Sequence, residues 1–242
     1  MENSTALVTG ANKGIGREIA RQLAAAGHTV YLGSRDPARG ERTAGETRGD
    51  VRLVVLDVTD AASIAAAARQ VPELDILVNN AGISGGGQTP DTEDVGTFRQ
   101  IYETNVFGVV AVTNAFLPAL RRSAHPRIVN ISSGTGSLAA SAGQATGAFV
   151  SARQTTGSFA AYRSSKAALN ELTVLYAHAL AADGFKVNAL APGLRRTELN
   201  PVAAASGGDP AEAAAGAVRL ALLPDDGPTG QFLSFDGSVV PW

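Results

Sequence analysis

The chain of 242 residues contains no cysteine and only three histidines. Without cysteine it can form neither a disulfide nor a thiolate metal site. His28, His125 and His178 stand far apart in the sequence, without the spacing of metal ligands. We therefore predict no metal site, and we interpret each histidine as structural or as part of the surface.

Charge and long apolar runs are also scarce. Charged residues make up 17% of the chain and the formal net charge is −2, so nothing predicts nucleic acid or an anionic membrane as a partner. No apolar run approaches the ~20 residues of a membrane-spanning helix. The first predicted strand begins by Ala6, which leaves no room for a signal peptide. We expect a cytoplasmic protein.

The chain has instead many short runs of Val, Ile and Leu that alternate with helical patterns. The predicted strands lie near residues 6–9, 28–33, 51–56, 74–79, 127–132, 186–190 and 231–235, and the longer predicted helices near 95–120, 162–181 and 210–222. Buried strands joined by helices predict an α/β fold, a doubly wound parallel sheet of Rossmann type with helices on both faces. We find no linker, so residues 1–242 are expected to form one domain. Ligands bind such sheets beyond the carboxyl ends of the strands.

A glycine-rich turn follows the first predicted strand. Gly10, Gly14 and Gly16 have the spacing Gly-x-x-x-Gly-x-Gly, and Ile15 and Ile19 then fall on one face of a helix. Glycine lets the backbone bend tightly and approach an anion closely, while the first helical N–H groups point at it. The spacing differs from the common G-x-G-x-x-G fingerprint, and three glycines alone are weak evidence. The strand before them and the helix after them favour a nucleotide site.

The end of the second predicted strand bears on the choice of cofactor. Asp36 lies 20 residues after the last glycine of the turn, where an acidic ribose ligand would indicate NAD. Because Pro37 follows, we interpret Asp36 as a helix N-cap. Ser34 and Arg35 instead offer a hydroxyl and a guanidinium to a 2′-phosphate, with Lys13 as a second cation. Such bonds contribute about 2–4 kcal/mol and favour NADP(H) over NAD(H). If both cations are merely solvated, the preference stays undecided.

A phenol and an ammonium are expected on one helical face. Tyr162 and Lys166 are four residues apart, although such a pair is also common on solvated helices. It gains weight from Ser133, the second serine after the fifth predicted strand, and from Asn105 in the long helix before that strand.

Two further motifs complete the pattern: Asn79-Asn80-Ala81-Gly82 after the fourth strand and Pro192-Gly193 after the sixth. With them the whole chain resembles the short-chain dehydrogenase/reductase family. The resemblance implies the sheet order 3-2-1-4-5-6-7. The catalytic residues that it implies are Asn105, Ser133, Tyr162 and Lys166. The cofactor residues that it implies are Gly10, Asn12, Lys13, Gly14, Ile15 and Gly16 at the pyrophosphate; Ser34 and Arg35 at one ribose; Asp57 and Val58 at the adenine; Asn79, Ala81 and Gly82 at the adjoining ribose; and Tyr162, Lys166, Pro192, Gly193, Leu194 and Thr197 towards the nicotinamide.

The chemistry of carbonyl reduction accounts for these residue types. Hydride goes to carbon and a proton to oxygen, so an acid and a second donor must reach one oxygen. We assign the acid to Tyr162 and the second donor to Ser133. Lowering a phenol pKa from about 10 to about 7 requires ~4 kcal/mol, roughly what one cation at about 4 Å supplies. Lys166 is the expected cation. That Asn105 holds a water which connects Lys166 to solvent is implied by the resemblance alone.

Residues 134–160 are mostly Gly, Ala, Ser and Thr, and they place Ser133 and Tyr162 29 positions apart. Most members of the family have fewer residues here, and an insertion at this point is characteristic of the carbonyl reductase branch. We expect a lid or substrate wall rather than a passive insertion. The branch consists of NADPH-dependent reductases that are often monomeric, which favours a monomer over a homodimer by a small margin.

The predicted function is therefore NADPH-dependent reduction of a small ketone, aldehyde or quinone, apolar or aromatic in character. Two alternatives remain. One is an NAD(P)-dependent alcohol dehydrogenase that works in the oxidative direction, and the other is a non-catalytic regulator that senses NADP(H). Arg153, Arg195 or Arg196 could bind an acidic group on a substrate, but we interpret each as a surface charge.

Overall fold

The computed structural model describes residues 3–145, 156–199, 204–205 and 207–242. Its centre is a parallel sheet of seven strands in the order β3-β2-β1-β4-β5-β6-β7, which confirms the predicted order. The strands are β1 (Thr5–Val8), β2 (Thr29–Ser34), β3 (Val51–Val55), β4 (Ile76–Asn79), β5 (Arg127–Ile131), β6 (Lys186–Ala191) and β7 (Phe232–Ser234). The order reverses between β1 and β4, where doubly wound sheets bind their ligands.

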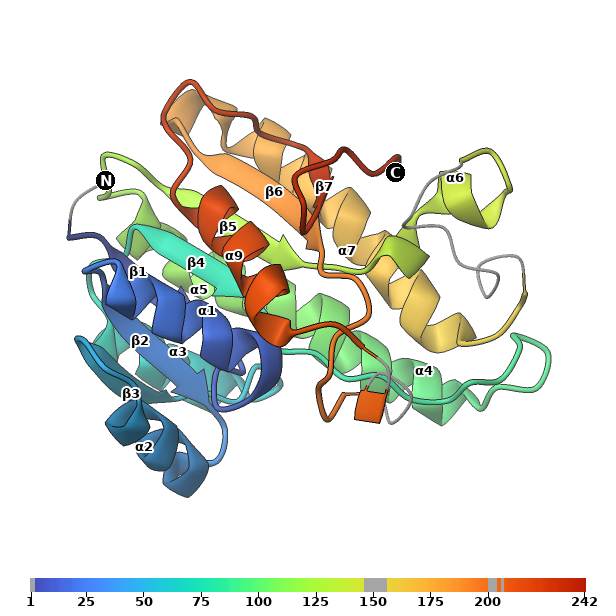
Figure 1. Ribbon diagram of the computed structural model, residues 1–242, viewed down its shortest axis with the longest axis horizontal. Helices are drawn as coiled ribbons and strands as arrows, with labels where there is room; N and C mark the ends of the chain where they lie inside the picture. Colours follow the sequence, from blue (N-terminus) through green and yellow to red (C-terminus); the bar gives the residue numbers. More distant parts are fainter. Residues whose placement is uncertain (1–2, 146–155, 200–203, 206) are drawn as a thin grey trace.

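Helices cover both faces of the sheet (Figure 1). Helices α1 (Gly14–Ala25) and α9 (Pro210–Ala221) pack on one face, and α3 (Ala61–Gln70), α5 (Gly108–Leu120) and α7 (Ala160–Ala179) on the other. Successive strand residues face opposite layers: Ala6 and Val8 of β1 lie in the first core and Leu7 in the second. Burial on both faces is why Ala6, Leu7 and Val8 are apolar in succession. Among the described residues, no helix is long and apolar enough to cross a membrane.

The segment from residue 95 to residue 120, predicted as one helix, is interrupted. Helix α4 (Val95–Tyr102) and α5 are joined by a π-helical turn over Glu103–Phe107. The predicted interpretation of Asp36 is confirmed: its carboxylate accepts a hydrogen bond of 3.1 Å from the N–H of Arg39, with Pro37 at the start of α2 (Pro37–Glu46). The N-cap of α2 could be predicted from the neighbouring residues Asp36 and Pro37. The π-helical turn could not, because it involves a contact with a distant residue, described below.

The segment between Ser133 and Tyr162 is partly structured. A 3₁₀ turn covers Gly134–Gly136 and a short helix, α6, covers Leu138–Ser141. The backbone N–H of Ala139 donates to the carbonyl of Trp242 over 2.9 Å, so α6 lies beside the C-terminus, as Figure 1 also shows. Residues 146–155 of the predicted insertion, Arg153 included, lie outside the described residues.

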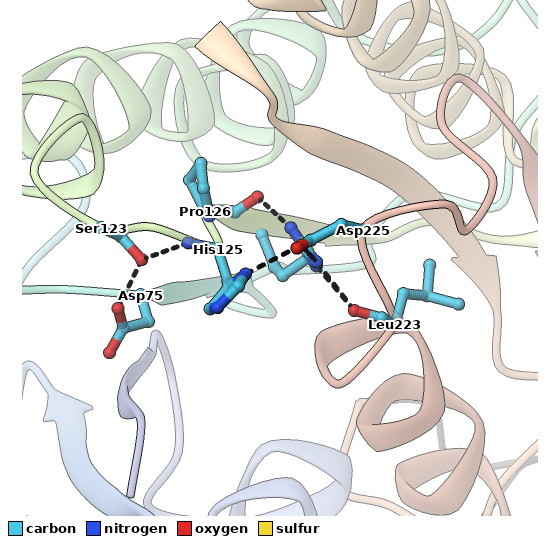
Figure 2. Close-up of polar contacts among 7 residues, drawn as sticks. Asp75, Ser123, His125, Pro126, Leu223 and Asp225 are labelled. Atoms are coloured by element: carbon cyan, nitrogen blue, oxygen red, sulfur yellow. Dashed lines mark hydrogen bonds and ion pairs between the residues drawn. The ribbon is translucent and has the colours of Figure 1, made fainter. Parts of the chain in front are cut away.

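A fully buried arginine stands at the amino end of β5, away from the carboxyl ends of the strands (Figure 2). The guanidinium of Arg127 donates to the carbonyls of Pro126 and Leu223 and, over 2.7 Å, to the carboxylate of Asp225. The same carboxylate oxygen lies 2.9 Å from Nδ1 of His125. These two side chains, Arg127 first, lower the pKa of Asp225. The cluster ties β5 to the segment after α9.

Two helical glycines give opposite predictions for substitution by alanine. A Cβ on Gly45 in α2 would meet no atom within 4 Å, whereas one on Gly216 in α9 would lie 2.8 Å from the carbonyl oxygen of Phe235. We expect Gly45→Ala to raise the free energy of unfolding by about 0.5–1 kcal/mol through helix propensity. Gly216→Ala is expected to lower it by about 1–3 kcal/mol through overpacking. Urea unfolding of both variants measures this, and the packing described for α9 is contradicted if both stabilise.

Candidate active site

The glycine turn combines two residues in the left-handed conformation with two close backbone contacts. Gly10 and Gly14 have positive φ angles of +61° and +56°, in the left-handed region that favours glycine. A Cβ on Gly10 would lie 2.9 Å from Cα of Ala81, and one on Gly16 would lie 2.7 Å from the carbonyl oxygen of Gly10. A side chain at either position would therefore clash. The turn leads directly into α1, whose first N–H groups face the same space.

Thr9 and Asn80 hold this turn against the end of β4. The amide of Asn80 donates to the carbonyls of Thr9 and Gly10 over 2.9 and 3.1 Å. In return, Oγ1 of Thr9 accepts from the N–H groups of Asn80 and Ala81. The sequence-based site included neither Thr9 nor Asn80, although Asn80 stands in the Asn-Asn-Ala-Gly motif. The motif could have suggested that the side chain of Asn80 is hydrogen-bonded, but not that it bonds to the carbonyls of Thr9 and Gly10.

A crevice of about 360 Å³ runs along the carboxyl ends of the strands, within the usual size of small-molecule sites. Fifteen of the predicted site residues line it: Gly10, Asn12, Lys13, Gly14, Ile15, Gly16, Arg35, Asp57, Val58, Ala81, Gly82, Tyr162, Lys166, Pro192 and Thr197. Residues that the sequence did not assign line it too, among them Asn80, Ile83, Ser84 and Glu198. One crevice thus joins the glycine turn to the predicted catalytic pair.

Four predicted cofactor residues lie elsewhere. The hydroxyl of Ser34 is buried and donates to the carbonyl of Asp36 over 2.7 Å, so it has no proton left for a phosphate. The amide of Asn79 is buried between Thr113 and Asn130, to which it donates over 3.0 and 2.9 Å. The side chain of Asn79 thus does not reach the crevice, whereas Asn80, the first residue after β4, lines it.

Gly193 and Leu194 also lie outside the lining of the crevice. Gly193 has a positive φ of +70° and turns the chain after β6. This turn leaves Leu194 51% exposed on the surface. Of the four predicted nicotinamide residues that follow β6, Pro192 and Thr197 line the crevice.

Four charged side chains, two cations and two carboxylates, stand around the predicted adenosine end. The side chain of Arg35 is exposed and its charge helps to lower the pKa of Asp57, behind the larger effect of the N–H of Thr59. Lys13, predicted as the second cation, is paired instead: its ammonium lies 2.8 Å from the carboxylate of Glu198. Arg35 forms no salt bridge within the described part of the chain, and it stays the predicted ligand of a 2′-phosphate.

Tyr162 and Lys166 lie on the buried side of α7, as their spacing predicts. A hydrogen bond with the side chain of Ser133 lowers the pKa of the Tyr162 phenol, but burial raises it by more. The ammonium of Lys166 donates to the carbonyl of Ile131 over 2.9 Å and lies 5.8 Å from the centre of the Tyr162 ring. In this arrangement burial outweighs the hydrogen bond, and a phenol pKa lowered by Lys166 together with an oxidised nicotinamide stays a prediction. Burial also lowers the pKa of Lys166 to about 8.

Asn105 explains the π turn. Its Oδ1 accepts from the N–H of Ile83, and its Nδ2 donates to the carbonyl of Ile83 and to Oγ of Ser165. Both N–H groups of the Asn105 amide are engaged, so this side chain could bind a water only through Oδ1. The role of Asn105 in holding a water stays a prediction. A Cβ on Gly82 would lie 3.2 Å from Oδ1 of Asn105 and 3.6 Å from Nζ of Lys166. The three groups therefore meet at one point of the crevice wall.

The two serines after β5 have different surroundings. Oγ of Ser132 is buried and donates to the side chain of Asn170 over 2.6 Å. Oγ of Ser133 is hydrogen-bonded to Oγ1 of Thr135 over 2.9 Å and to Tyr162. Ser132 lines the crevice, and the catalytic role of Ser133 stays a prediction. Thr135 was not identified from the sequence, because nothing local distinguishes it from its neighbours.

Comparison with known proteins identifies the class. The family model described as short chain dehydrogenase matches residues 4–148 and 147–206. The chain is 35% identical to (-)-isopiperitenone reductase of Mentha piperita, with 97% of each chain covered. It is also 35% identical to salutaridine reductase of Papaver bracteatum, with 94% of this chain and 93% of that protein covered. The NADPH-bound carbonyl reductase from chicken fatty liver is similar over 100% of both chains, at 30% identity and a TM-score of 0.84.

The chain belongs to the short-chain dehydrogenase/reductase family, as its motifs predicted. Within the family it resembles the carbonyl reductases. It is thus an oxidoreductase of a family that uses NAD(H) or NADP(H) and that includes reductases among the relatives of this chain.

The buried ammonium predicts a pH-dependent stability. Because the pKa of Lys166 is about 8 against an ordinary 10.5, its charge destabilises the folded state below pH 8. This effect disappears as the pH rises towards 10.5, since the unfolded chain then also loses the proton. The shift corresponds to about 3 kcal/mol, less about 1 for the bond to Ile131. We expect Lys166→Met to raise the free energy of unfolding by about 1–2 kcal/mol near pH 7.

Urea unfolding at about pH 7 and about pH 10 measures this effect, and the gain is expected to shrink at the higher pH. Lys186→Met, at the start of β6 and partly exposed, is the control for the removal of a lysine. A gain for Lys166→Met that does not change with pH would show that the ammonium is not desolvated.

Proposed function

We propose that this protein is an NADPH-dependent reductase of small carbonyl compounds, with Tyr162 as the general acid. The observation that carries the proposal is the placement of the phenol: it lines the same crevice as the glycine turn and is hydrogen-bonded to Ser133. The clashes that a Cβ would make at Gly10 and Gly16 support a cradle for a pyrophosphate. When bound there, the cofactor would supply the hydride.

The protein residues would handle the proton. Tyr162 donates it to the carbonyl oxygen of the substrate, and the hydroxyl of Ser133 polarises the same oxygen. A raised phenol pKa keeps Tyr162 protonated near neutral pH, which is the form that reduction needs. Oxidation of an alcohol would need the phenolate, so the raised pKa favours the reductive direction over the alternative. A sensor of NADP(H) would need no acid at this position.

The proposed preference for NADP(H) rests mainly on Arg35. Ser34 has no proton to offer and Lys13 is paired with Glu198, so the guanidinium of Arg35 is the main group left for a 2′-phosphate. The likeness to a carbonyl reductase with bound NADPH supports the same cofactor.

The proposed substrate is an apolar or aromatic carbonyl compound. Ile83 and Leu199 line the crevice near the catalytic pair, and the relatives include reductases named for isopiperitenone and salutaridine. We propose that residues 1–242 form a single domain with an insertion at 134–160, of which residues 146–155 lie outside the described part of the chain.

Removal of the phenol hydroxyl tests the acid. Tyr162→Phe is expected to lower the turnover number for an aromatic aldehyde or quinone with NADPH by at least about 100-fold, because no proton reaches the oxygen. The Kd for NADPH, measured by fluorescence titration, is expected to stay within about twofold of the parent.

The matched control is Tyr176→Phe. It removes another phenol of α7, one that donates to Asn114 over 2.9 Å. Equal turnover in Tyr162→Phe and Tyr176→Phe would exclude Tyr162 as the acid.

Removal of the guanidinium tests the cofactor preference. Arg35→Ala is expected to reduce the ratio of kcat/KM for NADPH over NADH by about 10-fold or more, through loss of a charge-assisted contact. Arg52→Ala removes an exposed, ion-paired arginine of β3 as the control. The assignment is wrong if the parent uses both cofactors equally or if Arg35→Ala leaves the ratio unchanged.

A further inference from the structure

Arg195, interpreted from the sequence as a surface charge, is buried. Only 6% of it is exposed, although it lies in the segment that follows β6. Its Nε donates to the carbonyl of Pro192 over 2.7 Å, and its Nη1 lies 2.6 Å from the carboxylate of Glu212 in α9. The guanidinium carbon stands 3.9 Å from the centre of the Phe235 ring, beyond β7. One side chain therefore connects three separate parts of the chain.

The backbone around Arg195 is fixed as well. The N–H of Arg196 donates to the carbonyl of Gly208, and the N–H of Gly208 donates to the carbonyl of Leu194, each over 2.9 Å. A Cβ on Gly208 would lie 2.1 Å from Nη1 of Arg195, so the absence of a side chain at this position makes room for the guanidinium. Arg195 and Gly208 thus form an isolated β-bridge in the connection between β6 and α9.

Residues 197–199, which follow Arg195 closely, line the crevice. A Cβ on Gly14 would lie 3.3 Å from the methyl group of Thr197. Glu198 pairs with Lys13, and the carbonyl of Leu199 accepts a hydrogen bond of 2.6 Å from Ser84. We name residues 197–199 the roof. Thr197 and Glu198 of the roof thus contact the glycine turn, and Leu199 contacts the segment after β4.

We propose that Arg195 is a positioning residue that holds the roof over the bound cofactor. This inference rests on the proposed function, because it names what the crevice holds. The pair Lys13–Glu198 is exposed to solvent and therefore contributes too little to fix the roof alone. The buried contacts of Arg195, which include a cation–π contact, give the roof a rigid base.

A role in stability alone would not explain the choice of arginine. Burial of a guanidinium carries a desolvation penalty, and an apolar side chain of similar volume is often as stable or more so. In addition, Nη2 of Arg195 is buried without a hydrogen-bond partner among the described residues. An apolar side chain cannot donate the hydrogen bond that Arg195 makes to the carbonyl of Pro192. We infer that this bond fixes the start of the segment that leads to the roof.

The experiment compares two buried arginines. Arg195→Met is expected to raise the Kd for NADPH at least about fivefold, as the roof loses its base. Turnover at saturating NADPH and substrate is expected to change much less, so the effect appears in KM for the cofactor. Arg127→Met removes the arginine at the opposite end of the sheet, whose contacts are shown in Figure 2. It is expected to lower stability and leave the Kd for NADPH unchanged.

Two milder variants decide the outcome if Arg195→Met does not fold. Glu212→Gln removes only the charge of an exposed partner, and Arg195→Lys keeps a cation without the fork of the guanidinium. Both are expected to raise the Kd for NADPH, by less than Arg195→Met. The inference is overturned if all folded variants at 195 and 212 bind NADPH as the parent and Arg127→Met do. Failure of the parent to bind either NADPH or NADH would instead overturn the proposed function.

Discussion

The ammonium of Lys166 is the buried charge around which the catalytic end of the crevice is organised. Burial lowers its pKa to about 8, and the carbonyl of Ile131 accepts its hydrogen bond over 2.9 Å. A buried charge persists only where its surroundings are fixed. Here β5 supplies the carbonyl, α7 supplies the lysine, and Gly82 leaves the space between them open. The stability given up at this position is of the kind found at functional sites.

The other end of the crevice depends on close backbone contact rather than on charge. Gly10 meets the chain at Ala81, and Asn80 ties the glycine turn to the end of β4. The two ends are linked because β4 leads into Gly82, beside Lys166, within a few residues of this brace. A shift of the glycine turn would therefore displace Gly82 and the groups beside it, Lys166 among them.

Much of the fold could be predicted from the sequence, because it is written in local patterns. Apolar strands that alternate with helices gave the sheet, and Asp36 before Pro37 gave the start of α2. Side chains whose roles depend on distant partners were predicted less well. The direction of Asn79 depends on Thr113 and Asn130, and the π turn depends on the bond from Asn105 to Ile83. The burial of Arg195 depends on Phe235 and Glu212, both far along the chain.

The central claim is that the site holds a protonated phenol beside a desolvated ammonium. NMR titration of the protein labelled with ¹³C at the phenol carbon of its four tyrosines reads this directly, with the Tyr162 signal assigned from its absence in the phenylalanine variant. In the protein without cofactor, Tyr162 is expected to titrate above the ordinary value of 10.0. A titration of this signal near neutral pH would contradict the claim, because the site would then hold a phenolate.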